Sequence, residues 1–349
     1  MKTCSTWPLA VVATSLIGPL ATARRVVESE LDGNISRSLA EFKKGATPVV
    51  ATSPEEHLVV ALPGLNDGDL PTKQYAGHIP VVDGFHFYWL FESASADPSS
   101  DPLVIWLNGG PGCSSMDGLW LENGPFRLAD SDHKITVNPY RQERGWLLGN
   151  WHKAANVMYV DQPVGTGLSF TTKGNYADND LEVDQQFYRF LSNFFELHSE
   201  FKAEGGKSRP IFFTGESHAG HYIPSMVAYI LGQNDAVLAA GKGELVMDVQ
   251  GMMIGNGWID PVSQYDVSDY AFGMGLIDAG QRRALKRKEE DCLASIKGGN
   301  YNVHVCMALM DSVVAASGGK ASSVPRVSMY DVRKFELGRQ FPPGHAIVE

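Results

Sequence analysis

The sequence predicts an α/β fold with a mostly parallel sheet. Three continuous apolar runs, each typical of a strand buried on both faces, cover residues 102–107, 156–160 and 210–214. Between the second and third runs, apolar side chains recur at three- and four-residue spacing over 187–197 and form the stripe of a packed helix. Alternation of buried strands with helices is typical of the α/β class.

The other elements fit the same plan. Residues 78–82 and 86–91 predict two strands of a hairpin that turns through an Asp-Gly pair. A further helix is expected over 223–231 and a further strand over 246–254. After that strand the buried-strand pattern gives way to a charged helix and Gly-rich loops, so we expect a helical, cap-like insertion over about 258–325.

Composition and charge exclude several classes of protein. The 349-residue chain is 44% hydrophobic and 20% charged, which is typical of a globular protein with a sizeable core. Its formal net charge of −11 argues against a basic nucleic-acid-binding surface. Four cysteines are too few for a small disulfide-stapled scaffold. We expect no cofactor and no metal ion.

The N-terminus is typical of a secretory signal peptide. Lys2 precedes an apolar stretch over 7–20 that is too short to span a bilayer, and an A-x-A-like cleavage site follows at 21–23. We therefore expect residues 1–23 to be removed. Three cysteines would remain, so in an oxidising compartment one thiol stays free or its partner lies outside this chain.

The next segment is polar and has no clear period. We interpret residues 24–56 as a propeptide-like lead, which carries the N-glycosylation sequon at Asn34, and residues 57–349 as the folded domain. No later apolar run approaches the length of a membrane span. We expect a protein of the secretory pathway, whether secreted, vacuolar or lysosomal, or held in the Golgi lumen, with no membrane segment in this chain.

Ser217 is the candidate nucleophile. It lies between Gly215 and the small residues Ala219 and Gly220, directly after a buried strand and directly before a helix. A sharp strand-to-helix turn exposes the serine hydroxyl, and the helix N-terminus favours a developing oxyanion. The alternative is a turn whose serine only caps the helix.

A serine nucleophile needs a histidine base and a carboxylate, which follow it along the chain in this arrangement. His218 and His221 lie on the helix that the turn opens and point the wrong way. His304 and His345 are the other downstream histidines, and neither has the sequence context of a base. We therefore expect the Asp and His of the triad to be missing from this chain.

Five sequence blocks, in order, resemble the signature blocks of the serine carboxypeptidases. They lie at residues 106–115, 122–125, 161–167, 215–224 and 254–258. Smaller matches at 62–64, 76–78 and 329–333 are closer to the fungal-type Golgi processing branch. The resemblance covers about residues 58–335 and implies an α/β-hydrolase fold, of which the C-terminal part of the sheet is expected to be missing.

The resemblance also assigns roles. It makes Ser217 the acylating nucleophile and gives the oxyanion hole to the backbone N–H groups of Gly110 and His218. Five residues would bind the terminal carboxylate of the substrate: Trp106, Asn108, Gly109, Glu122 and Glu216. Because two carboxyl groups that meet a third cannot all be ionised, the site implies an acidic working pH.

Two departures from the family pattern concern single residues. The residue after the nucleophile is usually Tyr in the family but is His218 here. The family's counterpart of Cys113 has a disulfide partner farther along the chain. Here Cys292 and Cys306 are close enough to pair with each other inside the insertion, which would leave Cys113 alone.

The function that the resemblance implies is that of a serine-type carboxypeptidase. It would release C-terminal residues from peptides and proteins by acyl-enzyme chemistry at acidic pH. Two alternatives are a catalytically incompetent, truncated homologue that acts as a secretory scaffold, and an acyltransferase or esterase on the same fold. The sequence leaves the oligomeric state open.

Overall fold

The computed structural model describes residues 50–62, 64–65, 68, 70–128, 135–138, 150–241, 245–300, 304–318, 326–328 and 330–336. The expected signal peptide (1–23), most of the polar lead, Asn34 and His345 lie outside these residues. The chain divides into two compact units, residues 1–257 and 258–349, and each is described by itself.

The first unit is built around one mixed sheet. Its strands are β1 (Gln74–Val81), β2 (Gly84–Phe91), β3 (Leu103–Leu107), β6 (Asn156–Val160), β7 (Phe170–Thr171), β10 (Ile211–Glu216) and β11 (Val249–Gly255). The order is β1-β2-β6-β3-β10-β11, with β7 beside β2. Strands β6, β3, β10 and β11 pair in parallel, while β1, β2 and β7 pair antiparallel. The predicted α/β class and its parallel central strands are confirmed.

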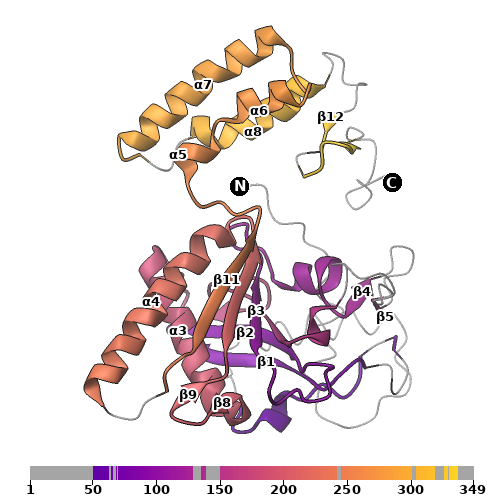
Figure 1. Ribbon diagram of the computed structural model, residues 1–349, viewed down its shortest axis with the longest axis vertical. Helices are drawn as coiled ribbons and strands as arrows, with labels where there is room; N and C mark the ends of the chain where they lie inside the picture. The colour runs from indigo at the N-terminus through magenta and orange to yellow at the C-terminus, as the bar shows by residue number, and fades with distance from the viewer. Residues whose placement is uncertain are drawn as a thin grey trace. The chain divides into compact units, whose positions relative to one another are not determined.

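Helices α3 (Asp180–Leu197) and α4 (Ala219–Ala240) cover one face of this sheet (Figure 1). The predicted stripe of α3, including Phe187, Phe190 and Phe194, is fully buried there. Helix α4 begins four residues earlier than predicted, because the turn after β10 leads directly into it. It ends at Gly241, which is in the left-handed region with φ 59°.

The opposite face is covered by apolar side chains of the short helix η2 (Gly118–Glu122), including Leu119 and Trp120, and of the strand β4 (Phe126–Leu128). Strand β5 (Ile135–Val137) pairs with β4. The smaller elements of the unit are η1 (Pro54–His57), η3 (Trp151–Lys153), η4 (Ser199–Phe201), β8 (Lys202–Ala203) and β9 (Lys207–Ser208).

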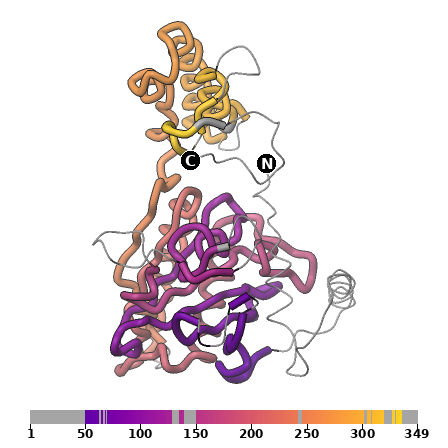
Figure 2. The backbone as a smooth tube through the Cα atoms, turned by 90° about the vertical axis from the view of Figure 1, so that its right-hand side faces the viewer, coloured from indigo at the N-terminus to yellow at the C-terminus, as the bar shows by residue number. Residues whose placement is uncertain are grey.

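The second unit is mainly helical, and Figure 2 traces its backbone. It contains α5 (Pro261–Gln264), α6 (Val267–Gly273), α7 (Ala279–Lys297), α8 (His304–Ser317) and the strand pair β12 (Arg326–Val327) and β13 (Phe335–Glu336). Helix α7 is the predicted charged helix, and the side chain of Asp278 caps it by accepting from two backbone N–H groups. No helix within the described ranges is long and apolar enough to cross a membrane.

The cysteines of the second unit pair as predicted. Cys292 of α7 and Cys306 of α8 form a disulfide. Cys113 of the first unit is also disulfide-bonded, so the prediction that it stays alone is wrong. None of the cysteines that the structure describes is free.

Candidate active site

Ser217 stands on a tight turn between β10 and α4. Its φ of 56° lies in the left-handed region, which is uncommon for a residue other than glycine and typical of a strained nucleophile position. Its backbone N–H donates to the carbonyl of Gly255 at 3.0 Å, which ties the turn to the end of β11. The turn also needs Gly215, because a Cβ atom there would lie 2.3 Å from the carbonyl oxygen of Leu107.

The loop after β3 crosses this turn at Gly109. A Cβ atom on Gly109 would lie 2.7 Å from the carbonyl oxygen of Glu216 and 2.9 Å from Cβ of Ser217. Gly110 follows with a φ of 118°. Neither its N–H nor that of His218 donates a hydrogen bond to another described residue. Two backbone donors beside the serine are therefore available to an oxyanion.

Asn108 organises a pair of carboxyl groups next to the turn. Its side-chain oxygen accepts from Nε1 of Trp106 at 2.7 Å and from the N–H of Gly118 at 3.0 Å. These two donors fix the orientation of the amide, so that its nitrogen faces the carboxyl groups. The nitrogen donates to Glu122 at 3.0 Å and to Glu216 at 3.2 Å.

The surroundings of Glu122 favour the protonated form of its carboxyl group. Burial raises the pKa of Glu122 to about 7, and the neighbouring Glu216 adds to this effect while the Asn108 hydrogen bond opposes it. Burial, with the charge of Glu216, also raises the pKa of Asp117. In acid the cluster therefore holds a proton that it can donate to an anionic ligand.

The loop after β3 is held from beneath by Asp161, which follows β6 directly. This buried carboxylate accepts from the hydroxyl of Ser114 at 2.7 Å, from the N–H of Ser115 at 2.8 Å and from the N–H of Leu168 at 2.8 Å. Burial raises its pKa to about 6. Asp161 thus positions the loop that carries Gly109 and Gly110.

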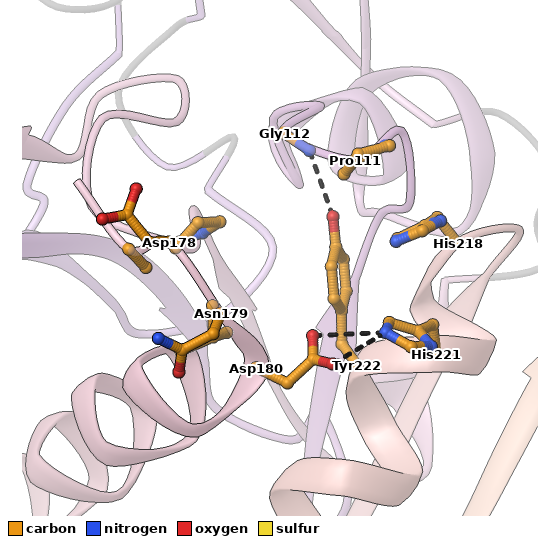
Figure 3. A pocket seen from close by; sticks show the side chains of 11 residues that line it. Pro111, Gly112, Asp178, Asn179, Asp180, His218, His221 and Tyr222 are labelled. Atoms are coloured by element: carbon orange, nitrogen blue, oxygen red, sulfur yellow. Dashed lines mark hydrogen bonds and ion pairs between the residues drawn. The ribbon is translucent and has the colours of Figure 1, made fainter. Parts of the chain in front are cut away.

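A pocket of about 320 Å³ opens beside the turn (Figure 3). Residues 178–180, at the start of α3, form one wall; His218, His221 and Tyr222 of the α4 side form another. The N–H of Gly112 donates to the hydroxyl of Tyr222 at 3.1 Å, and the His221 ring pairs with Asp180 at 3.1 Å.

Comparison with known proteins decides the family. The model of the family described as serine carboxypeptidase, Peptidase S10, matches residues 63–339. The chain belongs to the serine carboxypeptidase family. Among its relatives is the pheromone-processing carboxypeptidase KEX1 of Phytophthora infestans strain T30-4, which is 40% identical over 80% of this chain and 45% of that protein. Serine carboxypeptidase S10 family member 2 of Dictyostelium discoideum is 37% identical over 81% of this chain and 49% of its own length.

A solved structure supports the same family assignment. The crystal structure of Kex1Δp, a prohormone-processing carboxypeptidase from Saccharomyces cerevisiae, superposes with a TM-score of 0.69 and 29% identity. The match covers 84% of this chain and 64% of that chain. This chain of the serine carboxypeptidase family thus spans about half the length of the curated relatives it matches.

The structure brings together all the residues that the family resemblance places around Ser217, but no histidine among the described residues joins them as a base. The Ser217 hydroxyl has no hydrogen bond within the described part of the chain. His221 pairs with Asp180 instead, and His304 is an exposed residue at the start of α8 in the second unit.

Sequence reasoning missed two carboxyl groups of this family member's site. Asp161 directly follows a buried strand, and a polar residue at the carboxyl end of a parallel strand is the signal that could have identified it. Asp117 gave no such signal, because it follows no strand and lies in helical backbone immediately before η2.

Proposed function

We propose that this protein is a serine carboxypeptidase that removes single residues from peptide C-termini. Ser217 attacks the last peptide carbonyl while a histidine base takes its proton, and the N–H groups of Gly110 and His218 stabilise the oxyanion. The C-terminal residue leaves as an amine that receives this proton, and water then hydrolyses the acyl-enzyme. The described residues do not place such a base beside Ser217. The observation that carries the proposal is the Asn108 amide, which donates to Glu122 and Glu216 immediately beside the nucleophile.

This cluster suits the terminal carboxylate of a peptide. A protonated Glu122 and the Asn108 amide can donate to the carboxylate, while Trp106 and Gly109 complete the proposed binding set. The pKa of about 7 for Glu122 means that the donor form is lost as the pH rises above neutral. Substrate binding is therefore strongest in acid.

The proposed substrates are the C-termini of peptides and proteins within the secretory pathway. The signal-like N-terminus supports this location, and the similar proteins from Phytophthora infestans and Saccharomyces cerevisiae are described as pheromone- and prohormone-processing carboxypeptidases. The Golgi lumen, a vacuole or lysosome, and the exterior are all compartments that such a protein can occupy.

A fluorophosphonate probe and an N-blocked dipeptide test the proposal. In a protein that carries a histidine base beside Ser217, we expect the probe to label Ser217 and the last residue of the dipeptide to be released at about pH 5, while the C-terminal amide of the dipeptide stays largely intact. Without such a base, neither reaction is expected. Ser217→Ala should abolish both reactions, whereas Ser100→Ala, at an exposed loop serine, should abolish neither.

Other outcomes identify the alternatives. A folded chain that the probe does not label is a non-catalytic homologue. A chain that is labelled, spares the peptide and transfers or hydrolyses small acyl esters is an acyltransferase or esterase. Either result overturns the proposal.

A further inference from the structure

The pocket beside Ser217 is lined by two imidazoles and by the residues at the start of α3. His218 and His221 lie three residues apart on one side of the α4 N-terminus, with their ring centroids 5.2 Å apart. The Asp180 carboxylate faces them from the start of α3, whereas that of Asp178 turns away from both rings (Figure 3). Such a pocket changes its net charge when the imidazoles take up protons.

The remaining groups around the imidazoles do not cancel this change. From α4, Tyr222 stacks edge-on against His218 with centroids 5.0 Å apart, and its pKa is raised to about 12 by burial, so it stays neutral. From α3, Asp184 accepts from the Ser225 hydroxyl at 2.7 Å beneath the pocket. The loop of Pro111 and Gly112 contributes no charged side chain.

The part of the substrate that occupies the pocket follows from the proposed function, on which this inference rests. None of Asn108, Glu122 and Glu216, which would hold the leaving residue's carboxylate, lines the pocket. The pocket instead borders His218, directly after the nucleophile. The side chain of the residue on the acyl side of the scissile bond is therefore the group that reaches it.

We propose that His218 and His221 make this pocket a pH-dependent charge selector for the acyl-side residue. With neutral imidazoles, the Asp180 carboxylate gives the pocket a negative charge that rejects an anionic side chain. With protonated imidazoles, the positive charge of the two rings exceeds the negative charge of Asp180, so an anionic side chain is accepted and a cationic one loses its advantage. The serine carboxypeptidase thus changes its substrate preference with the acidity of its compartment.

The surroundings of His218 favour a neutral ring at pH 7. Burial and the neighbouring His221 lower the pKa of His218, and Asp180 opposes them. Its ring is therefore neutral at pH 7 and gains its charge in acid. His221 lies at hydrogen-bond distance from Asp180, which allows a charged pair to form when the imidazole is protonated.

Equilibrium binding to the full chain carrying Ser217→Ala tests the selector without requiring turnover. The probes are N-blocked dipeptides that share one leaving residue and carry cysteic acid, norleucine or trimethyllysine on its acyl side. The charges of these side chains stay fixed between about pH 4.5 and 7.5. The ratio of their dissociation constants therefore cancels every pH effect that the peptides share, including that of Glu122.

Between pH 7.5 and 4.5, we expect the affinity of the cysteic acid peptide relative to the norleucine peptide to rise roughly fivefold, as for partly exposed charge pairs. The relative affinity of the trimethyllysine peptide should fall by a similar factor. Adding His218→Tyr and His221→Gln together should remove this pH dependence. His304→Gln, at an exposed histidine of the second unit, should leave it unchanged.

A ratio that does not change with pH, a pH dependence that survives both substitutions, or a folded chain that binds none of the peptides overturns the inference. Fluorophosphonate labelling of the parent chain reports on the proposed function separately. Labelling with a constant ratio rejects the selector alone. A changing ratio without labelling rejects the catalytic proposal alone.

Discussion

A Cβ atom added to Gly109 would lie 2.5 Å from the backbone nitrogen of His218, a separation that real Cβ atoms essentially never show. Gly109 belongs to the loop after β3, and His218 opens α4. The atoms that meet are backbone atoms, which no side-chain rotation can move apart. The relative position of the loop and the nucleophile turn is therefore fixed by the absence of a side chain at residue 109.

Gly109→Ala should consequently displace the proposed oxyanion donors. We expect the rate of Ser217 labelling by a fluorophosphonate to fall about 100-fold or more, in line with the loss of one oxyanion-hole donor. Gly251→Ala on β11 is the matched control, because a Cβ atom there makes only ordinary contacts from 3.4 Å. Normal labelling of Gly109→Ala would show that the loop can move without cost.

Glu122→Gln should remove most of the pH dependence of substrate binding. Glu122 donates a proton only below its pKa of about 7, whereas a glutamine amide donates at every pH. The KM of the parent for a blocked dipeptide should rise as the pH increases from 5 to 8. The KM of the variant should stay nearly constant over this range.

The same substitution has a second consequence, which is a change in stability. A carboxyl group whose folded pKa is raised binds more protons in the native state, so stability falls as the pH rises from about 4.5 towards 7. Urea unfolding should show a smaller fall for Glu122→Gln than for the parent. An identical pH profile for both proteins would contradict the raised pKa.

A chain of hydrogen bonds on the other side of the sheet predicts acid sensitivity. His57 contacts the Tyr88 hydroxyl at 2.9 Å, the hydroxyl contacts His198 at 2.7 Å, and His198 contacts Glu200 at 2.8 Å. Burial lowers the pKa of His57 to about 4. The unfolded state therefore binds more protons between about pH 6.5 and 4, and stability is lost as the pH falls through this range.

We expect His57 to contribute about 2 kcal/mol to that loss, after allowance for its partial exposure. Urea unfolding of the parent and of His57→Gln at pH 7 and pH 4 measures the contribution. The variant should lose less stability than the parent between the two conditions, and His304→Gln should behave as the parent does.

The Cys292–Cys306 disulfide should stabilise the second unit. The bridge closes a loop with a sequence separation of 14, for which chain entropy predicts about 3 kcal/mol. The double variant Cys292→Ser, Cys306→Ser should lower the free energy of unfolding by about this amount in denaturant titrations. An unchanged midpoint in the double variant would show that packing of α7 against α8 is sufficient.

The sequence was most informative where one physical pattern dominates. Strands β3, β6 and β10 were predicted because burial on both faces produces an unbroken apolar run. The start of α4 was predicted at residue 223, whereas the turn at Ser217 starts the helix at Ala219. Helix α8 was not predicted, although its buried residues Cys306, Leu309 and Val313 recur at three- and four-residue spacing.

Some residues of the candidate site could be predicted from the sequence, and others could not. Asn108 and Glu216 are separated by 108 positions, and no periodicity could join them. Only their resemblance to family blocks predicted that they lie together. Asp161 and His221 were not assigned to the site from sequence, and His218 was assigned only through its backbone N–H, because the partners of these side chains come from other strands and helices.

Asp161 has a consequence for how readily this protein can acquire new specificity. It secures the loop of Ser114 and Ser115 from β6, while the pocket is shaped by side chains of α3 and α4. Securing the loop and shaping the pocket thus depend on different elements. Substitutions in the pocket can therefore change specificity without loosening the loop. A combinatorial library at His218 and His221 can vary the pocket while Asp161 keeps the loop in place, provided that Tyr222, whose hydroxyl accepts from Gly112, is left unchanged.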